Sequence, residues 1–433
     1  MTLTYPVARH QLGNGLRVVA SEDHATPAAT VHIHYDVGSR HEAPGRTGLA
    51  HLFEHMFFEG SARVAPGEHA LLMQSVGAVF NGGTATDLTV YFEHLPAGAL
   101  DLALWLEADR MATHGDALTQ ELLDTQRAVI TQEKHQRCDN VPYGNIHERL
   151  LNLVYPSGHP YHHPVIGSLA DLDNATLKEV AQFFRTWYVP GNAILAVTGD
   201  ITPEQVFTAA EEYFGAIPAG AEPPGVPARV LDPVGGQSRD DAAEPVPVAM
   251  TALGFRLPPN SATDPEILAC DLALRVVAGG TPSRAHERLV RELRAAQQVQ
   301  ALTDPRIGGN SLGTITVPAM PGADAGAIEK ELLDLLDALA ATGPSEEELA
   351  RAQAAATREL LATVSSSQGR AFTLAYSAAA FGDPELINTA PDRIAAITPD
   401  QVRQAAARWL RPDCAAIVTT RPALPGRGPS TEE

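Results

Sequence analysis

An internal repeat constrains the fold of this 433-residue chain more than any other feature of its sequence. The segment TLKEVAQFFRTWYVPGNAILAV, beginning at Thr176, aligns without a gap with TPDQVRQAAARWLRPDCAAIVT, beginning at Thr398. Trp187 and Pro190 of the first segment recur 222 positions later in the second. We therefore predict two copies of one unit, each ending in the same helix, turn and strand.

The pattern of apolar residues predicts both strands and helices within a copy. The first 45 residues alternate apolar and polar side chains around a turn signal at Asn14-Gly15, which indicates strands. Further strand patterns lie at 88–96 and 192–200, and helical periodicity lies at 48–59, 98–113, 118–138 and 174–188. Strands and helices without strict alternation favour an α+β fold.

A segment rich in Pro, Gly and Ala divides the chain near its middle. Residues 218–243 show little periodicity, and such a composition is typical of a linker between domains. We therefore predict an N-terminal repeat at residues 1–217, a linker at 218–243 and a C-terminal repeat at 244–433.

Charge and composition exclude several classes of partner. The chain has 31 Lys and Arg against 52 Asp and Glu, a formal net charge of −21 that would repel phosphate backbones and anionic lipid headgroups. We therefore expect no nucleic-acid partner. Three scattered cysteines fit reduced thiols. No leader pattern and no run of about 18 apolar residues is found, so we expect no membrane association and a cytoplasmic location.

The segment HLFEH, residues 51–55, carries the residues that point to chemistry. At about 100° per residue, His51, Glu54 and His55 gather on one helix face, which we predict to be exposed. The opposite, core-facing stripe contains Leu49, Leu52, Phe53, Met56 and Phe57. Two imidazoles one turn apart can hold one zinc ion, and an adjacent carboxylate can take a proton from its bound water. A polar face without a metal is the alternative, but the complete His-x-x-Glu-His pattern favours zinc.

A third protein ligand is needed for a hydrolytic zinc site. On the predicted helix at 118–138, Glu133 lies within an arc of apolar side chains, where an acid is costly unless it is paired or bound to a metal. That arc contains Leu122, Leu123, Val129 and Ile130. A buried ion pair or a half-exposed position at a frayed helix end explains Glu133 equally well. Gln126, two turns earlier, could hydrogen-bond the site or be a tolerated polar residue, and GHPYHHP at 158–164 is predicted to be a loop.

Motifs along nearly the whole chain point to one family. They are HLFEHMFFEG at 51–60, WLEADRM at 105–111, QRAVITQE at 126–133, GHPYHHPVIGSLADL at 158–172, and the paired WYVPGNAILAVTGD and RWLRPDCAAIVTTRP. Together they resemble the pitrilysin, insulinase and mitochondrial processing peptidase family of inverzincin zinc peptidases, particularly its shorter bacterial members. The resemblance implies two homologous αβ repeats, each an antiparallel sheet with helices packed on one face, in a clamshell around a chamber for unfolded peptides.

The resemblance also implies roles for the candidate site residues. His51, His55 and Glu133 would bind Zn²⁺, and Glu54 would act as the base in metal-assisted peptide hydrolysis. Many relatives carry Glu at the position of Gln126, which alters how Glu133 is polarised rather than removing the metal.

The segment FNGGTATDLTVY, residues 80–91, resembles the family's edge strand, to which a peptide substrate adds as a further β-strand. Its candidate substrate contacts are Asn81, Gly82, Gly83 and Thr84. The letters fit an Asn-Gly-Gly turn equally well. Family members usually have Asn-Ala where this chain has Asn81-Gly82, and a glycine loosens a strand.

The second half departs most from the resemblance. Active single-chain relatives supply an Arg and, seven residues later, a Tyr that hold the substrate, whereas this chain has Arg291 and Gln298. In some bacterial relatives one subunit carries the zinc motif and a homologous partner carries the Arg/Tyr pair. We therefore predict a zinc endopeptidase acting on unfolded peptides or leader segments as the zinc-bearing subunit of a dimer. The rivals are a non-catalytic peptide-binding or scaffold subunit and, last, a zinc hydrolase of non-peptide substrates.

Overall fold

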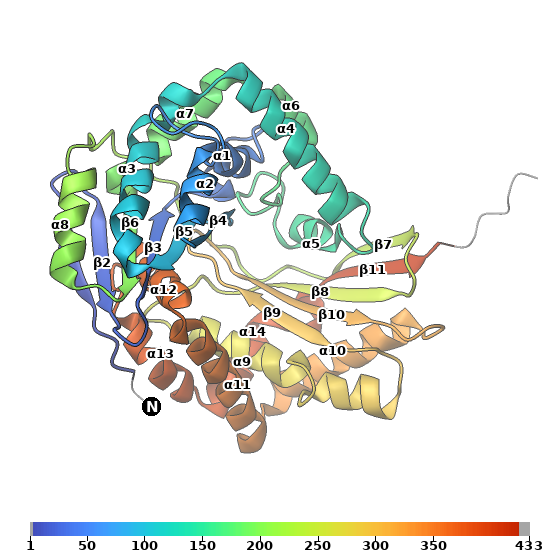
Figure 1. Ribbon diagram of the computed structural model, residues 1–433. Helices are drawn as coiled ribbons and strands as arrows, with labels where there is room; N and C mark the ends of the chain where they lie inside the picture. Colours follow the sequence, from blue (N-terminus) through green and yellow to red (C-terminus); the bar gives the residue numbers. More distant parts are fainter. Residues whose placement is uncertain (1–2, 424–433) are drawn as a thin grey trace, which may run out of the picture. The chain divides into compact units, whose positions relative to one another are not determined.

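The computed structural model describes residues 3–423, which form two compact units, each assembled from separate stretches of chain (Figure 1). The first contains the chain up to Gln132, His163–Pro227 and Thr357–Arg393, and the second contains Glu133–His162, Ala228–Ala356 and the chain from Ile394. The domain boundaries predicted above concern the sequence repeats rather than these units, and they remain a prediction. Within residues 3–423, no helix is long and apolar enough to cross a membrane.

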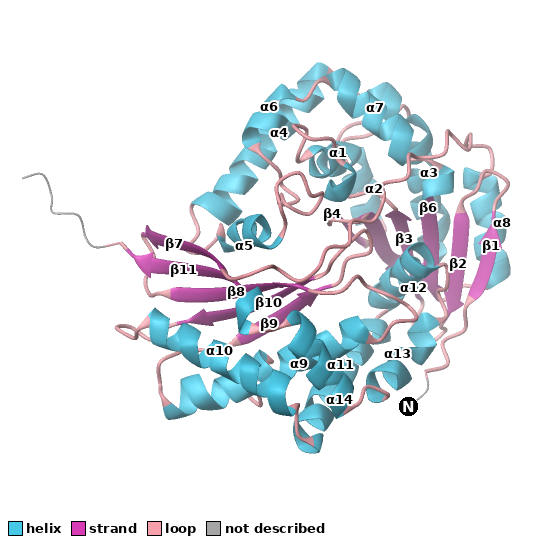
Figure 2. Cartoon of the chain, turned by 180° about the vertical axis from the view of Figure 1, so that it is seen from behind, coloured by secondary structure: helices cyan, strands magenta, loops and turns pink. Residues whose placement is uncertain are grey.

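Six strands form the sheet of the first unit (Figure 2). They are β1 (Ala8–Gln11), β2 (Arg17–Glu22), β3 (Ala28–Tyr35), β4 (Val79–Thr84), β5 (Thr89–Pro96) and β6 (Ala193–Gly199). Their order is β1-β2-β6-β3-β5-β4, which leaves β4 at one edge. Neighbouring strands are antiparallel except β2 and β6, which run parallel.

Five strands form the sheet of the second unit. They are β7 (Ser238–Glu244), β8 (Met250–Arg256), β9 (Gln300–Asp304), β10 (Leu312–Pro318) and β11 (Ala416–Pro422), in the order β7-β11-β8-β10-β9. Here β7 and β11 run parallel. The predicted α+β fold with two related repeats is confirmed, but the expectation of purely antiparallel sheets is wrong. The last strand of each repeat returns through a long helical connection, which allows it to pair in parallel with an early strand.

Helices cover both faces of the first sheet. The first unit contains α1 (Leu49–Phe57), α2 (Glu68–Ser75), α3 (Leu100–Ala117), most of α4 (Gln120–Lys134), α6 (Leu169–Asn174), α7 (Leu177–Trp187), α8 (Pro203–Phe214), α12 (Ser367–Phe381) and most of α13 (Leu386–Ala395). Leu195 and Val197 of β6 join the core shared with α1, α3 and α7, whereas Ile194 and Ala196 pack with Leu374 of α12. The prediction of helices on one face is therefore wrong. A strand that is apolar at successive positions is typical of burial on both faces.

The second unit carries α5 (Ile146–Val154), α9 (Glu266–Ala278), α10 (Ala325–Thr342), most of α11 (Glu346–Ser365) and α14 (Pro399–Trp409). Leu150 of α5 packs with Ala252 of β8 and Val418 of β11. Helix α5 thus comes from the first half of the sequence but covers the second sheet, while α12 comes from the second half and covers the first. Their starts, Ile146 and Ser367, lie close to 222 positions apart. The two repeats therefore exchange equivalent helices.

The predicted repeat of helix, turn and strand is confirmed at the end of both copies. Helix α7 is followed by a 3₁₀ turn at Pro190–Asn192 and β6, and α14 is followed by a 3₁₀ turn at Pro412–Cys414 and β11. Each helix begins with a capping box, in which the hydroxyl of Thr176 or Thr398 accepts a hydrogen bond from the backbone N–H three residues later. The matching threonines of the sequence therefore mark matching helix starts.

Candidate metal centre

The start of α1, the helix that carries the His-x-x-Glu-His pattern, is fixed by two local features. Gly48 precedes the helix with φ of +88°, and a Cβ there would lie 2.7 Å from the carbonyl oxygen of Ile166. The carboxyl group of Glu42 accepts hydrogen bonds from the backbone N–H groups of Gly48 at 2.9 Å and Ala50 at 2.8 Å, which caps the first turn. Burial raises the pKa of Glu42 to about 8, although these backbone donors oppose the shift.

Both faces of α1 are enclosed, which corrects one prediction. The apolar stripe is buried, as predicted. The side predicted to be exposed is enclosed as well, because His51 and Glu54 are each 9% exposed and His55 is half-buried. Helical arithmetic separates the faces of a helix, but it does not tell whether another element covers the second face.

Helices α1 and α4 bring His51, His55 and Glu133 together. One ligand atom of each lies within 4.8 Å of the others, and the two imidazole ring centres are 4.7 Å apart. Atoms bound to one zinc ion at about 2.1 Å are at most about 4.2 Å apart, so a small side-chain movement would let all three coordinate it. Two imidazoles and a carboxylate are a donor set that hydrolytic zinc sites use. The residues present therefore fit the metal.

Glu133 lies in the last turn of α4, where its side chain is 15% exposed. Leu123 and Ile130 are buried on this helix, but Val129, predicted to share their arc, is 43% exposed, so that detail of the prediction is wrong. Arg137 Nη1 lies 2.5 Å from Glu133 Oε1, so Glu133 has an ion-pair partner, but the pair is not the buried one that the sequence left open. The side chain of Arg137 is 75% exposed, and such a pair is weak in water.

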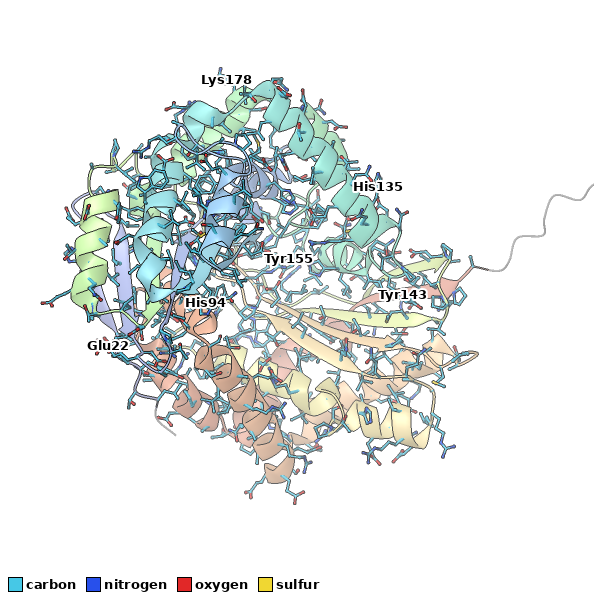
Figure 3. The ribbon with its side chains drawn as sticks, in the orientation of Figure 1. Glu22, His94, His135, Tyr143, Tyr155 and Lys178 are labelled. Carbon is cyan, nitrogen blue, oxygen red and sulfur yellow. The ribbon has the colours of Figure 1, made fainter. Side chains whose placement is uncertain are left out.

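Gln126 ties the two helices of the cluster together. Its side chain is 5% exposed, and its Nε2 donates a hydrogen bond of 3.2 Å to Oε1 of Glu59, two residues beyond the end of α1. The sequence left open whether Gln126 hydrogen-bonds the site or is a tolerated polar residue. The observed bond joins α4 to the end of α1, the helix that carries both histidines. His135, just beyond the end of α4 (Figure 3), pairs instead with Asp139 at 2.7 Å.

Glu54 is held by strand β4. Thr84 Oγ1 donates a hydrogen bond of 2.7 Å to Glu54 Oε2, and Thr84 is the last residue of this edge strand. The segment from Asn81 to Thr84 is therefore extended, and the alternative of an Asn-Gly-Gly turn is wrong. Sequence reasoning grouped Thr84 with the substrate contacts and missed its bond to Glu54. Thirty positions separate the two residues, and no periodicity links a strand to the helix before it.

Of the two adjacent glycines in β4, only Gly82 lies where neighbouring side chains leave no room for a Cβ. A Cβ on Gly82 would lie 2.8 Å from Cδ1 of Tyr91 and 2.9 Å from Cε2 of Phe58, the residue after α1. At Gly83, no described atom lies within 4 Å of the corresponding position. Gly82 therefore lets the end of α1 approach the edge strand.

Two buried tyrosines lie close to Glu54. Burial raises the pKa of both Tyr91 and Tyr188, and the negative charge of Glu54 adds to the shift. The Arg110 guanidinium lies 4.2 Å from the ring centre of Tyr91 and forms a buried ion pair with Glu107. Both phenols therefore remain protonated at neutral pH and act as polar packing groups rather than acids.

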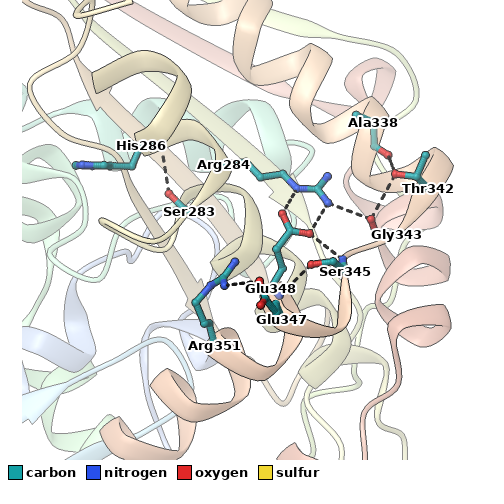
Figure 4. A network of polar contacts seen from close by, with 10 residues as sticks. All are labelled: Ser283, Arg284, His286, Ala338, Thr342, Gly343, Ser345, Glu347, Glu348 and Arg351. Carbon is teal, nitrogen blue, oxygen red and sulfur yellow. Dashed lines mark hydrogen bonds and ion pairs between the residues drawn. The ribbon is translucent and has the colours of Figure 1, made fainter. Parts of the chain in front are cut away.

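Arg291 lies in the second unit, in a π-helical segment before β9. Its side chain is 58% exposed and pairs with Glu287 at 3.3 Å. Together with three further arginines it lines a cavity of about 740 Å³ in this unit. One of these, Arg284, is held by Glu348 at 2.7 Å (Figure 4). Gln298 is exposed.

Comparison with known proteins places the zinc-motif half and the second half in one family. Residues 17–160 match the family described as Insulinase (Peptidase family M16), and residues 174–356 match Peptidase M16 inactive domain. Zinc protease PqqE of Helicobacter pylori is 30% identical over 336 residues, which are 76% of this chain and 73% of that protein. The chain belongs to the M16 peptidase family.

Other relatives of this M16 peptidase agree. An uncharacterized zinc protease of Mycobacterium bovis is 26% identical over 408 residues, 93% of this chain and 90% of that protein. A probable mitochondrial-processing peptidase subunit beta of Schizosaccharomyces pombe is 28% identical over 252 residues, 56% of this chain and 54% of that protein. The crystal structure of a protease from Helicobacter pylori has a TM-score of 0.88 at 25% identity, covering 97% of this chain and all of that one (100%). The resemblance noted in the sequence is thereby confirmed.

Proposed function

We propose that this M16 peptidase is a zinc-dependent endopeptidase that hydrolyses unfolded peptides or leader segments. The observation that carries the proposal is the convergence of His51, His55 and Glu133 within 4.8 Å, with Glu54 on the same helix as both histidines. In this proposal the first three residues hold Zn²⁺ and Glu54 is the catalytic base. Relatives named zinc proteases support the choice of metal.

In this proposal some residues of the site bind the metal and Glu54 transfers the proton. Zinc, when bound, polarises the scissile carbonyl and lowers the pKa of a coordinated water. Glu54 takes the proton of the attacking water and passes it to the nitrogen of the leaving amine. His51 and Glu54 are only 9% exposed, so little bulk water screens the charge of the Glu54 carboxylate or of a bound metal ion.

The open edge of β4 offers a way to bind the substrate. Among the described residues, β4 pairs with β5 along one side and with no strand along the other. An extended peptide would add there through backbone hydrogen bonds, which suit many sequences but require an unfolded segment. In this proposal Asn81, Gly82 and Gly83 contact the substrate, and Arg291 contributes from the second repeat. The predicted chamber between the repeats remains a prediction.

A homologous partner subunit would complete the site. The chain has Arg291 but carries Gln298 in place of the tyrosine implied by the family resemblance, and one relative is named as a subunit of a processing peptidase. We propose that this chain is the zinc-bearing half of such a dimer, in the cytoplasm. If the purified chain with zinc cleaves peptides as fast alone as in any mixture with a homologous partner, the dimer proposal fails.

The experiment that tests the peptidase function combines metal analysis with Glu54→Gln. The variant should retain about one zinc ion per chain and lose hydrolysis of an unfolded peptide by about 100- to 10,000-fold, because the base is removed while the ligands stay. Glu121→Gln, at an exposed position of α4, is the matched control and should change neither property. If wild type binds zinc and peptide but cleaves no faster than Glu54→Gln, both alone and mixed with a homologous partner, the chain is a peptide-binding scaffold instead.

A further inference from the structure

The hydrogen bond from Thr84 to Glu54 assigns a role to the end of the edge strand. We propose that Thr84 is a positioning residue, which holds the Glu54 carboxylate in the orientation that proton transfer requires. The inference rests on the proposed peptidase function of the same site. It differs from the sequence-based hypothesis, in which Thr84 contacts the substrate.

The geometry of the donor supports positioning. The distance of 2.7 Å from Thr84 Oγ1 to Glu54 Oε2 is a normal hydrogen-bond length, and a bond to a carboxylate is stronger than one between neutral groups. Threonine is stiff about its first side-chain torsion, and the backbone of Thr84 is fixed by its pairing with Thr89 of β5. The hydroxyl is therefore a fixed donor, whereas a glutamate side chain without one has several rotamers.

The bond restrains the orientation of the base. Oε2 of Glu54 accepts a hydrogen bond from Thr84, which limits rotation of the carboxyl group. A base must lie within hydrogen-bond reach of the proton that it removes, so loss of orientation lowers the rate without removing the base. The Thr84 hydroxyl is already engaged with Glu54 and is therefore a poor candidate for substrate binding.

The link also joins two parts of the proposed site. Glu54 lies on α1 between the two histidines, and Thr84 ends the strand whose open edge would take the peptide. The side chain that orients the base therefore stands at the end of the strand on which the substrate would lie.

The test uses Thr84→Val, which keeps the shape of the side chain but removes the donor, and Thr84→Ser, which restores it. With zinc-loaded full-length chain and an unfolded peptide, Thr84→Val should lower kcat about tenfold at unchanged KM, and Thr84→Ser should recover most of that loss. Zinc affinity should be the same in all three proteins. Thr86→Val, two residues beyond the strand and also half-buried, is the matched control and should leave kcat unchanged.

Combination with Glu54→Gln shows whether Thr84 acts through Glu54. The double variant should have the kcat of Glu54→Gln alone, since no base is left to orient. A further tenfold loss in the double variant, or a rise in KM at constant kcat in Thr84→Val, would overturn the inference in favour of substrate contact.

A readout without turnover separates this inference from the peptidase proposal. Melting temperatures of the wild type, Thr84→Val, Glu54→Leu and the corresponding double variant should be non-additive, because Glu54→Leu removes the acceptor that a glutamine would keep. If wild type proves inactive both alone and mixed with a homologous partner subunit while the melting temperatures remain non-additive, the peptidase proposal fails and the Thr84–Glu54 link stands as a structural bond without a catalytic role. Additive melting temperatures overturn the link itself.

Discussion

Helices α1 and α9 occupy equivalent places in the two repeats but differ in chemistry. The 222-residue spacing that relates the repeats places Ala273, Val276 and Val277 of α9 at the positions of His51, Glu54 and His55. All three are buried, with at most 4% of each residue exposed. The second helix therefore uses for packing the positions that the first uses for a candidate metal site.

The same difference extends to the third candidate ligand. Ala355 of α11 stands 222 positions after Glu133 of α4. The matched description of residues 174–356 as an inactive domain agrees with this loss of polar residues. The same fold thus accommodates polar or apolar side chains at these positions. Burial of imidazoles and carboxylates costs free energy, whereas burial of alanine and valine does not. The first repeat has that cost at its candidate metal site.

The largest difference is expected between His55→Ala and Val277→Ala, its equivalent in the second repeat. The proposed function makes half-buried His55 a zinc ligand. Its truncation should therefore lower zinc affinity about 1000-fold or more, beyond the ten- to hundredfold typical of outer-shell changes. Val277 is fully buried, so its truncation should leave zinc binding intact but lower the free energy of unfolding by about 2 kcal/mol. Metal titration and urea unfolding of both variants check this. Equal zinc affinity in the two would contradict the assignment of His55.

Sequence reasoning reached the parts of the fold that depend on local patterns. Periodicity located α1, α3, α7, β5 and β6 to within a few residues, and helical geometry placed His51, Glu54 and His55 on one side of α1. The arc containing Glu133 was predicted with one error, at Val129. These inferences depend on residues within a few turns of one another.

The features that escaped prediction depend on contacts between distant segments. The exchange of α5 and α12 depends on the path of the chain between the two sheets. The composition of either helix does not indicate which sheet it covers. Strand β4 helps to enclose the second face of α1 and supplies the bond from Thr84 to Glu54. Helix α2 and two turns separate this strand from α1 in the sequence. Arg137, in contrast, stands four residues after Glu133, and this helical ion-pair spacing could have been found in the sequence.

Buried histidines provide a second way to test the difference between the repeats. Five lie in the first unit with lowered pKa, namely His32 and His69 at about 4, His34 and His41 at about 3, and His114 at about 4. Desolvation by burial is the main cause in each. His32 lies edge-on to Phe372 of α12, and its counterpart in the second repeat, Gly254, does not titrate.

The sign of the pH effect follows from the direction of these shifts. Between pH 6.5 and about 4, the unfolded chain binds a proton at His32 that the folded chain does not, so stability is complete above pH 6.5 and falls with acidification. His32→Leu should reduce the loss in unfolding free energy between pH 8 and pH 5 by about 2 kcal/mol. Hydrogen exchange at both pH values should show protection lost from the β3–α12 contact first. An unchanged pH dependence in His32→Leu would mean that His32 is not buried in its neutral form.

The smallest expected effect on stability concerns β4 and β9, edge strands at equivalent places in the two repeats. Strand β4 has two adjacent glycines and β9 has none. Gly82→Ala should lower the free energy of unfolding by about 1–2 kcal/mol, because the added methyl meets the rings of Phe58 and Tyr91. Gly83→Ala, the matched control, adds the same methyl in open space and should be neutral or stabilise by about 0.5 kcal/mol. Urea unfolding midpoints compare the two. If both variants unfold at the same midpoint, the end of α1 does not depend on the glycine, and the approach of the base to the edge strand must be maintained by the Thr84 hydrogen bond instead.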